Sequence, residues 1–473
     1  PGFEIVGLPE TCVKESRVRV RAALANSGFD LPNRKITVNL APADLRKGGA
    51  SFDLAVAVGL LAAAGAVAPS RIATTLLLGE LSLFGDLLRV RGVLPQLLAA
   101  ARRGIPTAVV PVGNANEAAL ARGIDVRVAR TLLEVREFLD GLADLPAPEP
   151  DLREARSTHD DVDDLSDVRG QEGARRALEI AAAGGHGLLL VGPPGAGKTM
   201  LARRLRTILP PLSADEALEV QAIASIASIA IARRASRPFR APHHTASEVA
   251  LVGGGEPVRP GEITLAHRGV LFLDELPEFR RSALEALRQP LEDGVVSIVR
   301  ARSRMTFPAR PVLVAAMNPC PCGYAGDPRR SCRCSPERVR TYRARLSGPL
   351  LDRIDMHVAV SAVPVGALAS SERGESSASV RARVVGAREA SRVRGRSVNA
   401  TLVGEELVRF CAPDRAGFAL LARAVDQLGL SARAYTRVLR VARTVADLDG
   451  ADAVVARHVA EAIGYRLLDR TPE

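Results

Sequence analysis

Residues 188–205, LLLVGPPGAGKTMLARRL, place the pattern G-x-x-x-x-G-K-T between a short apolar run and a segment with helical spacing. Glycines allow backbone N–H groups to close around phosphates, the lysine reaches the terminal phosphates, and the threonine hydroxyl can ligate Mg²⁺. A glycine-rich turn without function is the alternative, but a strand before and a helix after favour a phosphate loop. We therefore predict that ATP and Mg²⁺ are bound by Gly192, Pro193, Pro194, Gly195, Ala196, Gly197, Lys198 and Thr199.

Two carboxylates follow a second apolar run, GVLFLDEL (269–276), about 75 residues after the phosphate loop. At the end of a strand, Asp274 can hold Mg²⁺ through water and Glu275 can polarise the attacking water. A third apolar run, PVLVAAMN (311–318), ends in Asn318, which would lie beside the γ-phosphate and orient water. Surface acids after a strand, and an Asn that caps a turn, are the corresponding alternatives.

The elements that must position these residues fall into three blocks. Residues 1–139 are apolar and mixed, with a strand expected in RKITVNLAP and a helix in EVREFL (134–139). An acidic, Pro-rich linker (140–167) precedes an α/β nucleotide-binding core (168–365), and a Ser/Gly/Glu-rich linker (366–379) precedes a helical region (380–473). A chain of 473 residues is long enough for roughly three domains.

The charge balance favours a polyanionic partner. Lys and Arg number 64 against 53 Asp and Glu, a net charge of +11, and such an excess is typical of nucleic-acid binding. Aromatic residues make up 3% of the chain and Trp is absent, which argues against a base-stacking platform. Any grip on nucleic acid should therefore act on the phosphate backbone.

The longest uncharged apolar run, residues 54–68, has 15 residues and contains two glycines. This is short of the ~20 residues that span a bilayer, so we predict a buried helix and no membrane segment. The chain starts without a basic-then-apolar signal, and we expect a cytoplasmic location. Because it begins at Pro1 rather than Met, we expect a fragment that lacks an upstream piece.

Four of the six cysteines lie within 15 residues, in the spacing C-x-C-x9-C-x-C: Cys320, Cys322, Cys332 and Cys334. Their pairing by spacing, with Pro and Gly for tight turns, favours a structural tetrathiolate Zn²⁺ site. Free thiols are one alternative, and disulfides, which a reducing compartment disfavours, are another. Since the cluster follows Asn318 directly, a metal there would brace that strand rather than do chemistry. Cys12 and Cys411 stand alone.

GPPGAGKT, FLDEL and AAMNPCPCG together resemble the magnesium-chelatase-like branch of AAA+ ATPases. Longer stretches, including PFRAPHHTASEVALVGGG and LSGPLLDRIDMHV, resemble the ComM/YifB family specifically, and the likeness covers nearly the whole chain. The resemblance implies an N-terminal Lon-protease-like α+β domain, an AAA+ P-loop α/β core and a C-terminal helical lid. It also implies a homo-hexameric DNA helicase that promotes branch migration in recombination during natural transformation. Members usually carry a further strand or two ahead of PGFEIVGLP, which this chain lacks.

The resemblance also assigns two arginines. Arg353 in LLDRID would be the finger that reaches a neighbouring subunit's site, where it neutralises charge on the γ-phosphoryl group. From the residues alone, a surface arginine paired with Asp352 or Asp355 is the alternative. Arg433 resembles the second sensor on the lid, and Arg437, one helical turn later, is its rival.

Two segments are candidates for contact with DNA. Residues 238–262 resemble the helix-two insert of chelatase- and replicative-helicase-like motors, and GVVSIVRARSRMTF (294–307) is predicted to form a hairpin. On an extended strand, Arg300, Arg302 and Arg304 would share one face, and we predict that they track DNA phosphates. A solvated face is the alternative. The adjacent His243 and His244 are not predicted to bind metal, because no cysteine is near.

The stretch LGELSLFGDLLRVRGVLPQLLAAARRGIPTAVVP resembles the Lon-protease-like domain, whose active members use a Ser–Lys pair. Ser51 falls near the nucleophile position, but Leu94 stands where the activating lysine should be, and leucine cannot activate a hydroxyl. We therefore predict an inactive domain. Two other functions remain open: a magnesium-chelatase-type subunit that drives metal insertion into a porphyrin, and a chaperone-like ring. The fused N-terminal block and the basic charge argue against the first.

Overall fold

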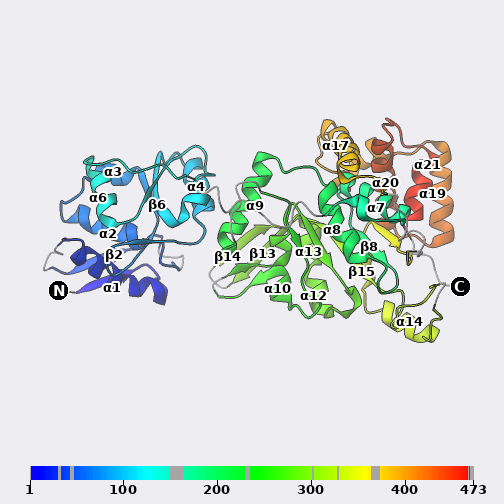
Figure 1. The fold of residues 1–473 in the computed structure, drawn as a ribbon, viewed down its shortest axis with the longest axis horizontal. Coiled ribbons are helices and arrows are strands. Elements are labelled where there is room, and N and C mark those ends of the chain that lie inside the picture. Colours follow the sequence, from blue (N-terminus) through cyan, green and yellow to red (C-terminus); the bar gives the residue numbers. More distant parts are fainter. Residues whose placement is uncertain are drawn as a thin grey trace.

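The computed structural model describes residues 2–29, 34–42, 47–149, 163–229, 235–256, 258–300, 303–327, 330–363, 373–466 and 468. The N-terminal block lies at one end of the molecule, the α/β core lies in the middle, and the C-terminal helices cover the other end of the core (Figure 1). The mixed α/β architecture with a helical C-terminus confirms the predicted fold class. Parts of both predicted linkers, residues 150–162 and 366–372, lie outside the described residues, as do the last two residues of the predicted core, 364–365.

The N-terminal block contains three small sheets surrounded by helices. Its strands are β1 (Phe3–Val6), β2 (Ile36–Asn39), β3 (Thr75–Leu77), β4 (Glu80–Leu81), β5 (Leu87–Leu88), β6 (Thr107–Pro111) and β7 (Asp125–Ala129). Its helices are α1 (Thr11–Asn26), α2 (Asp53–Ala63), α3 (Pro69–Ala73), α4 (Val93–Arg102), α5 (Ala115–Ala118) and α6 (Leu132–Asp140). The strand expected in RKITVNLAP and the helix expected at 134–139 are confirmed. So is the buried apolar helix, which ends at Ala63, before Gly65 adopts φ +79°.

The core is built on a five-stranded parallel sheet in the order β16-β8-β15-β12-β9. The strands are β8 (Leu188–Val191), β9 (Phe239–Arg240), β12 (Val270–Leu273), β15 (Val312–Met317) and β16 (Met356–Ala359). Alternate residues enter two different apolar cores: Leu188 and Leu190 face one, and Leu189 and Val191 face the other. This two-sided burial explains the unbroken apolar runs in the sequence. Because the strands are parallel, the carboxyl ends of β8, β12 and β15 lie at one edge of the sheet.

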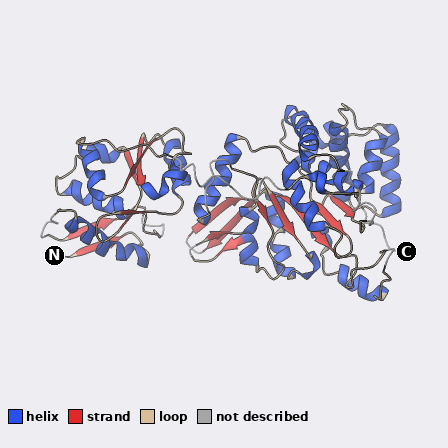
Figure 2. Ribbon diagram, viewed as in Figure 1, coloured by secondary structure: helices blue, strands red, loops and turns tan. Residues whose placement is uncertain are grey.

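Helices cover both faces of this sheet (Figure 2). They are α7 (Glu172–Gly184), α8 (Lys198–Ile208), α9 (Ala214–Ala227), α10 (Glu248–Val252), α11 (Glu262–Leu265), α12 (Arg281–Ala286), α13 (Arg288–Asp293), α14 (Pro336–Arg343) and α15 (Gly348–Leu351). Two antiparallel ribbons project from the core: β10 (Gly253–Gly254) with β11 (Arg259–Pro260), and β13 (Val295–Arg300) with β14 (Ser303–Pro308). The second ribbon confirms the hairpin predicted at 294–307.

The C-terminal region is helical, as its periodicity predicts: α17 (Ser377–Val393), α18 (Gly404–Cys411), α19 (Arg415–Leu428), α20 (Ala432–Leu448) and α21 (Ala456–Gly464). Short 3₁₀ turns lie at Val112–Asn114, Leu165–Asp167, Leu276–Glu278 and Asn399–Thr401. Helix α17 begins inside the predicted second linker, because the Ser376 side chain accepts a hydrogen bond from Ser379 N and caps it there. In the part of the chain described here, no helix combines the length and apolarity needed to cross a membrane.

A buried carboxylate joins the N-terminal block to the core. Glu117, 3% exposed, accepts hydrogen bonds from Asn114 Nδ2 at 2.6 Å and from the hydroxyl of Ser225 on α9. Helices α4 and α9 pack against each other beside this contact. A carboxylate removed from water needs such partners, so the two blocks share a specific polar contact rather than apolar packing alone.

Candidate active site

The loop between β8 and α8 forms a cradle of backbone amides. Gly195 and Gly197 have φ of +77° and +84°, which glycine adopts without strain. A Cβ on Gly192 would stand 2.1 Å from the Val360 carbonyl oxygen, so only glycine fits there. Helix α8 begins at Lys198, and its unpaired N–H groups face the loop. Pro193, Pro194 and Ala196 complete the turn, and the cradle has the form that phosphate oxygens require.

Lys198 occupies the centre of this loop. Its Nζ donates to the Gly192 and Pro193 carbonyl oxygens at 2.7 and 3.0 Å and to Asn318 Oδ1 at 3.1 Å. Burial lowers the pKa of Lys198, and the charges of Asp274 and Glu275 oppose that shift. The ammonium therefore holds the loop closed with carbonyl and amide oxygens, and phosphate oxygens are better partners for it than these neutral groups.

Thr199 and Asp274 meet at the end of the neighbouring strand. Thr199 Oγ1 donates to Asp274 Oδ2 at 3.0 Å, and Glu275 N donates to Asp274 Oδ1 at 2.9 Å. A hydroxyl and a carboxylate oxygen placed together are a hard donor set that suits Mg²⁺. They line a cavity of about 500 Å³ together with Met200, Glu275, Met317 and Asn318, a size that accommodates a nucleotide. The residues present therefore fit ATP and Mg²⁺.

Glu275 has a partner that the sequence analysis missed. Its backbone is left-handed, with φ +51°, and its Oε2 lies 3.2 Å from Nδ1 of His244. Both side chains are accessible, at 54% and 31% exposure. Strand β9 pairs with β12 in parallel, so the chain leaving β9 passes beside the chain leaving β12. Strand order, and not spacing along the chain, brings His244 to this carboxylate.

Gln171 is a second residue that the sequence analysis missed. It precedes α7 with φ +55°, and its Nε2 donates to the Ala196 carbonyl at 2.7 Å and to the Ser361 carbonyl at 3.0 Å. The side chain thus ties the phosphate loop to the segment after β16. The motif VRGQ, which stands just before an amphipathic helix, is the only local signal that could have indicated it.

Arg353 lies at the other end of the sheet from this pocket. Its carbonyl oxygen is 3.5 Å from the Cβ position of Gly187, the residue that precedes β8, whereas the phosphate loop follows β8. The guanidinium donates to the Arg288 and Pro349 carbonyls at 3.2 and 2.8 Å and pairs with Glu292 of α13. Neither Asp352 nor Asp355, the partners considered from sequence, takes this role. Arg353 therefore contributes nothing to its own chain's pocket.

The two lid arginines differ sharply in burial. Arg433 is 61% exposed and only its Nη1 approaches a carboxylate, Asp352 Oδ2, at 3.8 Å. Arg437 is 15% exposed and is paired with Asp355, whose side chain is almost fully buried. Arg437 thus forms an ion pair with a buried carboxylate, and Arg433 is the more accessible of the two lid arginines.

The hairpin corrects one argument made from the sequence. In the register of β13 and β14, Val299 is opposite Arg304 and Arg300 is opposite Ser303. Positions 300 and 304 therefore fall on opposite faces of the ribbon, and the shared face predicted from their spacing is wrong. Arg302 and the side chain of Arg300 lie outside the described residues. Arg304 is exposed, next to the exposed apolar side chains of Val299 (71%) and Met305 (42%).

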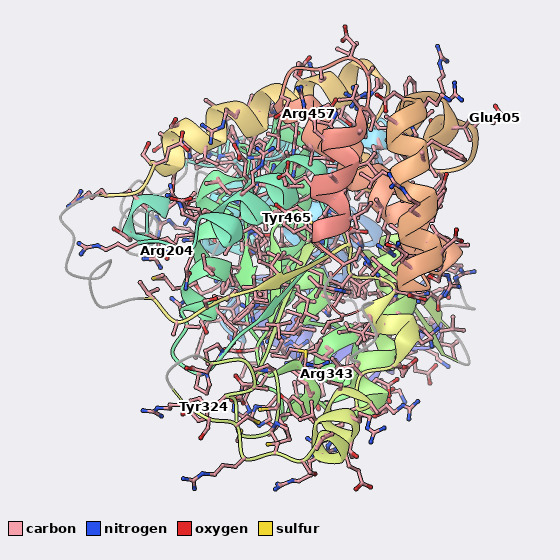
Figure 3. The ribbon with its side chains drawn as sticks, turned by 90° about the vertical axis from the view of Figure 1, so that its right-hand side faces the viewer. Arg204, Tyr324, Arg343, Glu405, Arg457 and Tyr465 are labelled. Atoms are coloured by element: carbon pink, nitrogen blue, oxygen red, sulfur yellow. The ribbon has the colours of Figure 1, made fainter. Side chains whose placement is uncertain are left out.

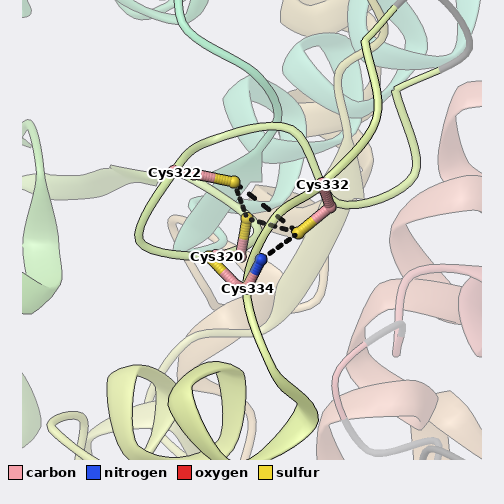
Figure 4. A group of neighbouring side chains, drawn as sticks. All are labelled: Cys320, Cys322, Cys332 and Cys334. Atoms are coloured by element: carbon pink, nitrogen blue, oxygen red, sulfur yellow. Dashed lines mark hydrogen bonds between the residues drawn. The ribbon is translucent and has the colours of Figure 1, made fainter.

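The other predicted residues occupy two further places. Leu94 is fully buried on α4, and Lys47 donates its ammonium to the Pro42 carbonyl. The four clustered cysteines converge in the loop between β15 and α14 (Figure 4), with sulfur atoms within 4.8 Å of one another. This loop lies on the side of the core away from the lid: Figure 3 shows Tyr324 and Arg343 below the core and Arg457 and Glu405 above it.

Comparison with known proteins gives a consistent set of likenesses. Three family models match: "Subunit ChlI of Mg-chelatase" over residues 1–114, "Magnesium chelatase, subunit ChlI" over 164–368, and "Magnesium chelatase, subunit ChlI C-terminal" over 374–466. The competence protein ComM of Haemophilus influenzae is 47% identical over 99% of this chain and 93% of that protein. The uncharacterized protein YifB of Escherichia coli is 47% identical over 99% of this chain and 92% of its own length. A magnesium-chelatase 67 kDa subunit of Heliobacterium mobile is 27% identical over 41% of this chain and 30% of that protein.

Proposed function

The chain belongs to the ComM/YifB family of magnesium-chelatase-like AAA+ ATPases, and from this premise we propose that it is an ATP-driven motor on DNA. The similar protein from Haemophilus influenzae is named for competence. We infer that this chain promotes branch migration when incoming single strands recombine in natural transformation. One observation supports this proposal most directly: the phosphate pocket lies at one end of β8, whereas Arg353 lies at the other end.

Within the pocket, each side chain has a distinct task. Bound ATP with Mg²⁺ supplies the phosphoanhydride bond whose hydrolysis drives the motor. Lys198 binds terminal phosphate oxygens, and Thr199 and Asp274 hold the metal. Asn318 orients water from the side of β15, and a Glu275 oxygen accepts its proton. In this structure Oε2 of Glu275 lies 3.2 Å from His244 Nδ1, which leaves the other carboxylate oxygen to accept the proton.

The position of Arg353 supports assembly into a ring. Gly187 and Gly192 flank the four residues of strand β8, and at about 3.3 Å per residue these two glycines stand about 16 Å apart. An arginine held beside Gly187 therefore meets phosphate only if a second copy presents its pocket there. A homo-hexamer in which each subunit completes its neighbour's site satisfies this requirement, and hydrolysis then depends on assembly.

The basic hairpin supports DNA as the substrate. Arg304 extends from a narrow antiparallel ribbon whose apolar side chains, Val299 and Met305, are also exposed. A ribbon of this kind, repeated around a ring, would line a pore with cations that neutralise backbone phosphates. The net charge of +11 acts in the same direction.

The ATPase rate of the purified chain, with and without single-stranded and forked DNA, tests the proposal. We expect stimulation by DNA, a ring in electron micrographs, and movement of a synthetic three-strand junction that depends on ATP. An ATPase that neither binds nor responds to DNA would contradict the motor-on-DNA assignment. Stimulation by a porphyrin-binding partner or by unfolded protein would instead indicate a chelatase-type or chaperone-type ring.

Replacement of Arg304 by Ala separates the DNA contact from the ATP chemistry. If Arg304 contacts one backbone phosphate, the slope of log affinity against log salt should fall by about one unit. Basal ATPase should be unchanged, because Arg304 does not line the nucleotide pocket. Thr306, which is exposed on the same strand, offers a matched control as Thr306→Ala, which should leave the slope unaltered.

A further inference from the structure

The four clustered cysteines are not used by the ATPase chemistry, yet their sulfur atoms have the spacing of a metal site. Cys320 Sγ lies 3.3 Å from Cys322 Sγ and 3.6 Å from Cys332 Sγ, and the last two sulfurs are 3.6 Å apart. Zinc bound at about 2.3 Å from each sulfur of a tetrahedron requires edges of about 3.8 Å. A disulfide requires about 2.05 Å, and all four thiols are free. The sulfurs leave room for one ion.

Backbone groups around the cluster favour thiolates. Ala325 N donates to Cys320 Sγ at 3.3 Å, and Cys334 N donates to Cys332 Sγ at 3.4 Å. Such N–H donors stabilise sulfur that carries negative charge, and they orient the ligands of metal sites. Cys320 is fully buried, whereas the other three are half-buried, so the site is shielded on the side that faces the core.

The surrounding charge suits a bound anion complex. Zinc with four thiolates carries a net charge of −2, and the sequence GYAGDPRRSCRC that follows Cys322 has three arginines and one acid. One of them, Arg330, stacks over Tyr324 at 5.1 Å and donates to its hydroxyl at 2.8 Å, which fixes a cation on the loop between the two cysteine pairs.

We propose that Cys320, Cys322, Cys332 and Cys334 bind one structural zinc ion, and that this ion braces the phosphate loop. The loop between the first cysteine pair and Ala325 packs directly on Pro194: a Cβ on Gly323 would stand 2.6 Å from Pro194 Cδ. Asn318, two residues before Cys320, accepts a hydrogen bond from the Lys198 ammonium through its Oδ1 atom. The zinc site therefore fixes a surface against which the nucleotide loop rests. The bracing of the phosphate loop rests on the proposed ATP site, and it does not depend on whether the protein acts on DNA.

Zinc content tests the site. Elemental analysis of the full chain, purified without chelators, should give about one zinc per chain. Cys332→Ser with Cys334→Ser should lose it, whereas Cys411→Ser, which changes a buried lone cysteine in the lid, should retain it. A wild-type protein without zinc, bound iron in its place, or a double variant with full zinc would each overturn the assignment.

A second measurement covers the case in which the double variant does not fold. Titration of the native chain with a mercurial that attacks thiolates should release its zinc, read with a metal-binding dye, as four thiols react. Zinc that is released before any thiol reacts, or that stays bound after all have reacted, would place the metal elsewhere.

The brace is tested by two glycine substitutions with similar backbone strain. Gly323 and Gly326 have φ of +87° and +77°, but a Cβ at Gly326 meets nothing within 4 Å. Gly323→Ala should retain one zinc and bind a fluorescent ATP analogue about tenfold more weakly, whereas Gly326→Ala should bind it as the wild type does. Equal affinity of both variants for the ATP analogue would contradict the proposal that the zinc loop braces the phosphate loop, whatever the DNA experiments show.

Discussion

The two ends of strand β8 carry charged groups that are organised in opposite ways. At the carboxyl end, Lys198 and Glu275 line an open cavity of about 500 Å³. Their protein partners, the Gly192 carbonyl oxygen and the His244 ring, can be replaced by a ligand. At the amino end, the buried Asp355 pairs with Arg437 and lies 3.4 Å from Nδ1 of the buried His186. Open charges can exchange a protein partner for a ligand, and buried ones cannot without a large cost. The first end is therefore suited to chemistry and the second to architecture.

The buried end docks the lid onto the core. Asp355 Oδ2 accepts from Gly187 N at 3.0 Å, and His186 Nε2 lies 2.8 Å from Thr444 Oγ1 of α20. Burial alone would raise the pKa of Asp355, but the Arg437 guanidinium and the His186 ring hold it well below its usual range. The carboxylate stays charged and fixes α20 against the start of β16. The difference from the pocket predicts which substitutions affect turnover and which affect stability.

The largest effect is expected from Arg353, which borders the buried end but is proposed to serve the pocket of a neighbour. Arg353→Ala should lower ATP turnover about 10³-fold, the scale of an arginine finger, and leave DNA binding intact. Mixed rings with a Lys198→Ala chain should regain activity, because the intact Arg353 of that chain completes the pocket of the Arg353→Ala chain.

A matched variant removes the partner instead. Glu292, 61% exposed, pairs with Arg353, so Glu292→Gln should free the guanidinium without loss of turnover. Normal ATPase in uniform Arg353→Ala rings would assign Arg353, whose side chain is 13% exposed, to a structural ion pair with Glu292.

Glu275 offers the next largest effect and tests the open end directly. Glu275→Gln should lower ATP turnover about 10²-fold or more, since it removes the proton acceptor, while ATP still binds. Lys198→Ala should instead weaken ATP binding itself. Turnover and binding of a fluorescent analogue, measured on the same preparations, separate the two. Wild-type turnover in Glu275→Gln would mean that another group activates water.

Much of the open end could be predicted from the sequence because its residues follow strands directly. Once β8, β12 and β15 are recognised as parallel, the positions of Lys198, Asp274 and Asn318 follow from topology. His244 could not be predicted in this way, because its contact depends on β9 being the neighbour of β12. The prediction that the hairpin arginines share one face was wrong for a related reason. Spacing by two gives a common face only within one strand, and the chain reverses between Arg300 and Ser303.

The buried end could not be predicted from spacing at all. The sequence favoured Arg433 for the second sensor and left Arg437 as its rival, since one helical turn puts them on the same face. The structure distinguishes their surroundings: Arg437 lies beside the buried Asp355, and Arg433 remains at the surface. Long-range contacts of this kind follow from tertiary structure alone.

The third prediction tests the difference between Arg437 and Arg433 through the free energy of unfolding. Arg437→Ala should lower the free energy of unfolding by about 2 kcal/mol, because it leaves a buried carboxylate without its cation. This is below the ~3–5 kcal/mol typical of a broken buried pair, since Asp355 keeps Gly187 N and His186. Arg433→Ala should leave stability unchanged and lower DNA-stimulated turnover. Denaturation followed by circular dichroism checks the first effect, and equal stability losses in both variants would contradict the distinction.

The last expected effect, which vanishes at neutral pH, is a pH dependence set by His357, which is also at the buried end. Burial, reinforced by Arg466 and Arg437 and opposed by Asp355, lowers the pKa of His357 to about 3. In the unfolded chain the pKa returns to about 6.5, so the unfolded state takes up the proton first. The stabilisation is therefore complete above about pH 6.5 and is lost as the pH falls toward 3, by up to about 1.4 kcal/mol per pH unit. Free energies of unfolding measured between pH 7 and pH 4.5 should fall less steeply in His357→Gln, by close to one proton's contribution. Parallel slopes in the two proteins would show that His357 binds a proton equally well in the folded and unfolded chain, and that burial beside Arg466 and Arg437 does not exclude one.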